Sequence, residues 1–296
     1  MFFYVFMFFS CTSQPKVEEK PIKRVALVIG NQNYVENALD NPINDAKGIA
    51  RTLESIGFEV QLEVDLTLAE LDKALAILKN KIEENNTMVF IYFAGHGNTL
   101  SSDSSQEYLM MTDKNKRVLV SLYKFYDFLR ESKPRYNIIA IDACRDYKKE
   151  YVVKKTLESK TSVPNMARLK PLIPNFRGNF DRSARFIAGN KEKIEVELDN
   201  KYSYKMPRST IVSYATIHQQ RASDGKEYDQ KHSPYAQALM NYLDDEEIPI
   251  EEVFRRVRVA LLKKTDGEQS NQEEVNLEKN IWLVPKRANI AFAPPL

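Results

Sequence analysis

The stretch MVFIYFAGHG, residues 88–97, opens with an unbroken apolar run and ends in a histidine between two glycines. Such a run predicts a β-strand that is buried on both faces. Two further runs have the same character, VALVI at 25–29 and IIAI at 138–141. Segments with helical spacing of apolar residues, such as 68–82, separate the strands. This alternation predicts an α/β fold, with a mostly parallel β-sheet covered by helices on both faces.

The same patterns predict most of the remaining elements. We expect a helix that begins at Asn44 or Asp45 and stops at Gly57, because Asn and Asp are common N-caps and Gly a common C-terminal stop. Further strands are expected at residues 58–62, 108–111 and 209–214, and further helices at 122–129, 234–243 and 250–262.

Composition excludes several classes of protein. The chain has 296 residues, 43% of them hydrophobic, and a formal net charge of +2. These values are globular rather than disordered, and the charge gives no reason to expect nucleic acid as a partner. Two cysteines cannot form a disulfide framework, and with three histidines they make a structural zinc site improbable. One sizeable domain with additions is expected, over residues 23–296.

The N-terminal segment, residues 1–22, looks like a tether. An apolar run at 2–9 is too short to span a bilayer, which takes roughly 20 residues. It is followed by Ser10, Cys11 and a polar stretch, which resembles the end of a bacterial lipoprotein signal. Lipidation of Cys11 would place the protein at a bacterial cell envelope. Two alternatives are a disordered apolar tail and a cytoplasmic protein.

Residues 147–208 lack regular patterning and carry 15 Lys and Arg against 7 Asp and Glu. One interpretation is a solvated, disordered insertion. The other is a processing linker that the protein cuts itself. The candidate cleavage sites would then be Lys148, Lys149, Lys154 and Lys155.

Two reactive residues follow predicted strands. His96 follows the strand at 88–93, and Cys144 follows the strand at 138–141. In open α/β sheets, reactive groups collect beyond the carboxyl ends of the strands, so neighbouring strands would bring a thiol and a base together. We also expect a helix to begin near Cys144, which would favour the thiolate. Taken singly, each residue is more often structural.

The motifs around these residues resemble those of the caspase-like cysteine peptidases. They are FAGHG at 93–97, IDACRD at 141–146 and ALVIGNQNY at 26–34, with YAT at 214–216, ASDG at 222–225 and SPYA at 233–236. The histidine lies 48 residues before the cysteine, close to the roughly 50 typical of caspases. The resemblance extends from about residue 23 to about residue 265 and is strongest to the prokaryotic metacaspase and paracaspase branch.

This resemblance implies a caspase–haemoglobinase fold and a cysteine endopeptidase acting on polypeptides. Cys144 would attack the peptide carbonyl and His96 would move the proton. The backbone N–H groups of Gly97 and Cys144 would stabilise the oxyanion. No cofactor is required for this chemistry; calcium enters only as a candidate activator, without a motif that indicates it. No feature of the sequence predicts an oligomeric state.

Three aspartates predict the substrate preference. Asp45, Asp142 and Asp224 resemble the acidic S1 residues of metacaspases and paracaspases, which cleave after Arg or Lys, whereas true caspases cleave after Asp. A carboxylate can accept paired N–H bonds from an arginine. Asp45 could equally be a helix N-cap and Asp224 a turn residue before Gly225. Asp142 has no such alternative, because a carboxylate at the end of a buried strand needs a partner.

Two other functions compete with proteolysis. The first is a proteolytically silent caspase-like domain that binds or signals at the cell envelope; the presence of both His96 and Cys144 argues against it. The second is a phosphoacceptor receiver domain using Asp142. A receiver needs an acidic pair after its first strand, and GNQN stands there at residues 30–33.

Overall fold

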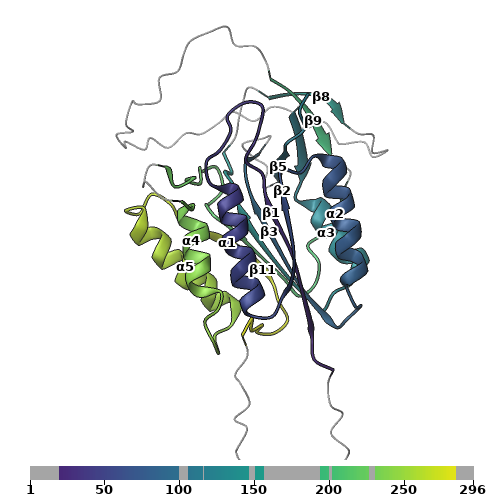
Figure 1. Ribbon diagram of the computed structural model, residues 1–296, viewed down its shortest axis with the longest axis vertical. Helices are drawn as coiled ribbons and strands as arrows, with labels where there is room; N and C mark the ends of the chain where they lie inside the picture. Colours follow the sequence, from purple (N-terminus) through teal and green to yellow (C-terminus); the bar gives the residue numbers. More distant parts are fainter. Residues whose placement is uncertain are drawn as a thin grey trace, which may run out of the picture.

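The computed structural model describes residues 20–99, 106–115, 117–146, 151–156, 194–199, 202–226 and 231–284. Its centre is a six-stranded β-sheet (Figure 1). The strands are, in spatial order, β11 (Gln272–Asn276), β10 (Thr210–Tyr214), β7 (Tyr136–Asp142), β3 (Thr87–Ala94), β1 (Lys23–Gly30) and β2 (Glu59–Val64). All neighbouring pairs are parallel except β10 and β11.

The central strands have the burial that their apolar sequences predict. Every residue of β3 and β7 is buried, as are the last six residues of β1. Strands covered on both faces read as continuous apolar runs, and this is why they can be recognised from sequence. The predicted mostly parallel sheet is therefore confirmed.

In the described part of the chain, five helices cover the two faces of the sheet (Figure 1). One apolar core joins the sheet to α1 (Pro42–Ser55), α4 (Pro234–Tyr242) and α5 (Ile250–Lys264). A second core joins the opposite face to α2 (Leu68–Lys81) and α3 (Tyr123–Ser132). The molecule is thus a three-layer α/β structure, and the carboxyl ends of five parallel strands lie together at one edge.

The start of α1 differs from the prediction. The helix begins at Pro42, with Asn41 as its N-cap, so Asp45 is an interior residue of the first turn rather than the cap. Proline is favoured at the first helical position because its missing N–H would have no partner there. The predicted stop is correct, because Gly57 follows the helix with φ +87°.

A second sheet was not predicted. It contains β4 (Gly97–Thr99), β5 (Glu107–Met111), β6 (Arg117–Ser121), β9 (Ile194–Asp199) and β8 (Tyr151–Thr156) in that spatial order. Only β5 was expected. Strands β8 and β9 lie in the segment predicted to be without pattern, and charged residues interrupt both strands. Lys154 and Lys155 therefore lie in a strand, whereas Lys148 and Lys149 lie outside the described residues.

No helix within the described part of the chain combines the length and the apolar character that a membrane crossing requires. Of the predicted tether, residues 1–22, the part that contains Cys11, residues 1–19, lies outside the described residues.

Candidate active site

The sheet brings the two reactive motifs together. Strands β3 and β7 are neighbours, and Ala94 is paired with Asp142 at their carboxyl ends. His96 and Cys144 follow these residues by two positions each. Both line one pocket with a cavity volume of about 80 Å³, together with Asp45, Asp142 and Asp224. All five side chains proposed from sequence thus surround one cavity.

Close packing at Gly97 holds the two motifs in contact. A Cβ atom at Gly97 would lie 2.7 Å from the Cβ of Ala143 and 2.8 Å from the carbonyl oxygen of Cys144. These distances leave no space for a side chain. Gly97, the expected oxyanion donor, therefore lies directly against the backbone of the expected nucleophile.

The ring of His96 is oriented by a backbone carbonyl. Nε2 of His96 lies 2.7 Å from the carbonyl oxygen of Asn37, and because a carbonyl only accepts, Nε2 carries the hydrogen. Nδ1 is then the nitrogen able to accept a proton. The Tyr34 ring packs 4.6 Å from the His96 ring, and its hydroxyl accepts a hydrogen bond from the His96 backbone N–H. The Asn37 carbonyl could not be predicted from sequence, because every residue has one.

Cys144 is partly exposed at the pocket, and its Sγ donates a long hydrogen bond of 3.6 Å to the carbonyl oxygen of Ala222. The expected helix does not begin here, because residues 143–146 have no helical structure. Within residues 143–146, no helix N-terminus therefore lies at Cys144.

A buried ion pair anchors the residue after the cysteine. Arg145 is only 2% exposed, and its Nε lies 2.7 Å from Oε1 of Glu107. Its guanidinium also donates to Gln272 and packs 3.9 Å from the Tyr214 ring. These contacts join the nucleophile loop to both sheets. The sequence motif contained Arg145, but its partner Glu107 was not predicted, since only the second sheet brings the two together.

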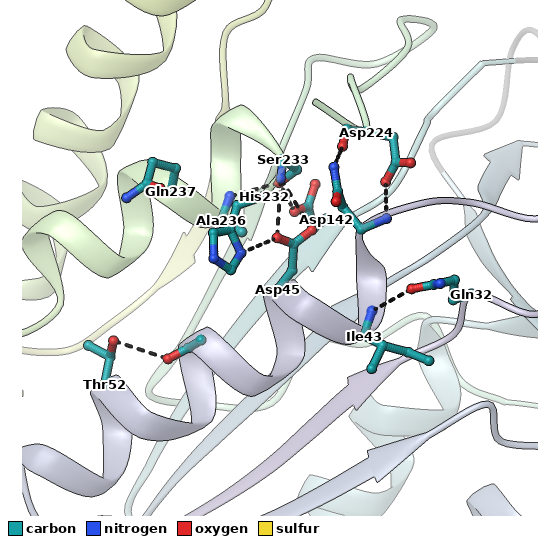
Figure 2. A network of polar contacts seen from close by, with 12 residues as sticks. Gln32, Ile43, Asp45, Thr52, Asp142, Asp224, His232, Ser233, Ala236 and Gln237 are labelled. Carbon is teal, nitrogen blue, oxygen red and sulfur yellow. Dashed lines mark hydrogen bonds and ion pairs between the residues drawn. The ribbon is translucent and has the colours of Figure 1, made fainter. Parts of the chain in front are cut away.

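Asp45 has a histidine and a backbone N–H as partners (Figure 2). Its Oδ1 accepts from Nδ1 of His232 at 2.9 Å and from the backbone N–H of Ser233 at 3.1 Å. Burial raises the pKa of Asp45 to about 6, against the lowering effect of the bond from His232. The carboxylate thus loses its charge at a higher pH than an exposed aspartate.

Asp142 is bound by two hydroxyl groups. Its Oδ2 accepts from the Tyr92 hydroxyl at 3.1 Å and from the Ser233 hydroxyl, and neither bond involves Oδ1. Burial raises the pKa of Asp142 well above its usual range, and the nearby charge of Asp45 raises it further. The partner that a buried strand-end carboxylate requires is therefore a pair of neutral donors and not a cation.

Asp224 combines a pocket position with a structural one. Its carboxylate accepts from the backbone N–H of Asp40 at 2.7 Å and of Asn41 at 3.3 Å, at the entry to α1 (Figure 2). Gly225 follows with φ +87°, as the turn interpretation predicted. The turn interpretation of Asp224 is thus confirmed and its S1 role stays a prediction, whereas the N-cap interpretation of Asp45 is wrong.

Sequence reasoning did not single out Ser233, which lines the pocket, or His232, which bonds Asp45 of the pocket. The motif SPYA was noted, but the histidine before it was not singled out. Nothing in the local sequence pairs residue 232 with residue 45. Within the described residues, no group of three or more His, Cys, Asp or Glu side chains could hold a metal ion.

Comparisons with known proteins agree with this geometry. The caspase domain family model matches residues 23–281. Among solved structures, the chain is similar to the crystal structure of caspase-1 from Spodoptera frugiperda, with a TM-score of 0.56 and 13% identity, covering 93% of this chain and 99% of that one. No curated protein matches. The fold is that of caspases, and the chain belongs to the caspase domain family of peptidases.

Proposed function

We propose that the protein is a cysteine endopeptidase that cleaves polypeptides after Arg or Lys, using Cys144 as nucleophile and His96 as base. The observation that carries the proposal is the shared pocket, in which a thiol and an imidazole lie beside three carboxylates. Family membership supports the coarser statement, a cysteine peptidase acting on polypeptides. The resemblance to metacaspases and paracaspases within that family stays a prediction from the motifs.

The proposed chemistry proceeds through a thioester. Nδ1 of His96 takes the thiol proton, and the thiolate of Cys144 bonds to the carbonyl carbon of the substrate. The oxyanion accepts hydrogen bonds from the backbone N–H groups of Gly97 and Cys144. The C–N bond then breaks, and the departing amine takes the proton from the imidazolium. Water, activated by His96, hydrolyses the thioester and restores the thiol.

The charge of the pocket supports a basic P1 side chain. Burial raises the pKa of both Asp45 and Asp142, and the charge of Asp224 raises both further. The charge of Asp45 also raises the pKa of Asp142. Their described partners are His232, a backbone N–H and two hydroxyls, so the carboxylates outnumber the basic side chains bonded to them. A bound guanidinium or ammonium would reduce this repulsion and form charge-assisted hydrogen bonds.

Turnover of three matched peptides tests the proposal. The purified protein should release a fluorophore from peptides with Arg or Lys at P1 and not from the peptide with Asp. Cys144→Ala should abolish the release and keep the fold. Activity that persists in Cys144→Ala, or cleavage only after Asp, would contradict the proposal. A proteolytically silent binding module predicts no turnover of any of the three.

We also propose self-processing in the basic segment. Lys148 and Lys149 are the better sites, because Lys154 and Lys155 belong to a paired strand. The fragments should stay associated, since β7 and β10 lie on opposite sides of the cut and pair in one sheet. Intact mass of wild type and Cys144→Ala, with and without calcium, measures this. A single uncleaved chain that still cleaves Arg peptides would contradict it.

A lipid anchor at Cys11 and a place at the bacterial cell envelope are the last part of the proposal, supported by the apolar run and the small residue before Cys11. Several acyl chains would hold the protein stably, whereas one gives only marginal binding. Cys11→Ser should move the protein from the membrane to the soluble fraction. Unchanged partitioning would contradict the anchor.

A further inference from the structure

The residues 232 and 233 connect the start of α4 to two aspartates of the pocket. Ser233 donates its backbone N–H to Asp45 and its hydroxyl to Asp142, while its Oγ accepts from the Ala236 N–H and so caps α4. His232 adds the side-chain bond of 2.9 Å to Asp45 (Figure 2). One dipeptide thus binds both carboxylates, which come from α1 and β7.

The imidazole of His232 is the only side chain among these contacts that binds Asp45. Asp45 itself is 1% exposed, so water cannot replace a lost partner easily. Because a carboxylate only accepts hydrogen bonds, Nδ1 of His232 carries the hydrogen in this pair. The bond therefore stabilises both the charged form of Asp45 and one orientation of its carboxylate.

A glycine on α1 makes room for this arrangement. A Cβ atom at Gly48, one turn after Asp45, would lie 3.4 Å from Cε1 of His232 and 2.4 Å from Sδ of Met240. The ring therefore rests over the helix at a position where any larger residue would displace its neighbours. Packing against α1 at Gly48 and the hydrogen bond to Asp45 thus both hold the His232 ring in position.

We propose that His232 is a specificity-determining residue, which positions Asp45 for the basic P1 side chain of the substrate. It acts through Asp45 and takes no part in bond making, so it is a positioning residue. The proposal rests on the function proposed above. We expect the hydrogen bond from His232 to Asp45 to affect the affinity for substrate and not the rate of the chemical step.

Replacement of His232 tests this through matched substrates. His232→Ala should raise KM for an Arg peptide about tenfold, the value of one hydrogen bond to a charged group, and leave kcat within about twofold. A peptide with citrulline at P1, the neutral isostere of Arg, should show no such change. His232→Asn, which keeps a donor at the position of Nδ1, should restore KM, and His232→Gln, which moves the donor outward, should not. Gln237→Ala in α4 is the control, because the side chain of Gln237 bonds Asn241 and not the aspartates of the pocket.

Binding to the inactive protein separates this proposal from the catalytic one. In Cys144→Ala, the Kd of the Arg peptide should rise about tenfold when His232→Ala is added and recover with His232→Asn. That result supports the role of His232 even if the wild type cleaves nothing. Equal losses for Arg and citrulline peptides, a fall in kcat alone, or no change with either substitution would overturn it. Melting curves identify any variant that fails to fold. If His232→Ala fails to fold, the Kd values of His232→Asn and His232→Gln are compared instead.

Discussion

Two buried charge clusters flank Cys144, and they differ in balance. On one side, Arg145 is matched by Glu107, with Gln272 and the Tyr214 ring completing its contacts. On the other side, Asp142 and Asp45 lie together with neutral donors and one histidine. A matched cluster needs no ligand, whereas an acidic cluster beside a cavity is stabilised by a cation. Charge balance thus distinguishes the anchor of the nucleophile loop from the part of the site that we expect to bind substrate.

Breaking the matched cluster should have the largest effect on stability. Arg145→Ala leaves Glu107 buried without its cation, and loss of one partner of a buried pair costs about 3–5 kcal/mol of unfolding free energy. Chemical denaturation measures the change. Arg221→Ala is the control, because Arg221 forms an ion pair with Asp146 while 77% exposed and should change stability little. Equal stability of Arg145→Ala and wild type would show that the cluster is not an anchor.

Changing the acidic cluster should affect activity instead. Asp142→Asn keeps the shape and the contacts with Tyr92 and Ser233 but replaces a buried carboxyl group of raised pKa with a neutral amide, so stability should be kept or rise. The value of kcat/KM for an Arg peptide should fall about 10- to 100-fold, because an amide cannot form the charge-assisted hydrogen bond that a carboxylate forms with a bound guanidinium. Asp45→Asn should have the smaller effect, since Asp142 lies two residues from the nucleophile. Undiminished cleavage after Arg by Asp142→Asn would contradict the role of this cluster.

The smallest expected effect is a pH dependence of KM. The raised pKa of Asp45, about 6, means that the carboxylate is charged above this pH and neutral below it. Attraction for a basic P1 side chain is therefore present above pH 6 and lost as the pH falls through 6. KM for the Arg peptide should rise about tenfold between pH 7 and pH 5. KM for the citrulline peptide should stay level. An equal rise of KM for the Arg and citrulline peptides would show that a titratable group other than Asp45 causes the pH dependence.

The fold was predictable where burial is uniform. The runs at 25–29, 88–93 and 138–141 are apolar because both faces of the central strands are covered, and each became a parallel strand. Strands β8 and β9 were missed because charged residues interrupt both short segments, so neither forms a continuous apolar run. Their pairing depends on β6, a partner far away in the sequence.

The site was predictable to the same extent. His96, Asp142 and Cys144 end or follow strands, so topology alone brings them to one edge. Asp224 precedes a turn and Asp45 lies in the first turn of α1, and both were proposed from the family resemblance. The Asn37 carbonyl, Glu107 and His232 were missed, because they reach the site through loop conformation or through the second sheet. No local pattern records such contacts.

The most direct test of the account is covalent labelling. An acyloxymethyl ketone with Arg at P1 should form one thioether with the protein, and peptide mapping should place it on Cys144. The label should be absent in Cys144→Ala, slowed in His96→Ala and weak when the probe carries Asp. No adduct on Cys144 in the folded wild type, or equal labelling by the Arg and Asp probes, would contradict an active thiol beside an acidic pocket.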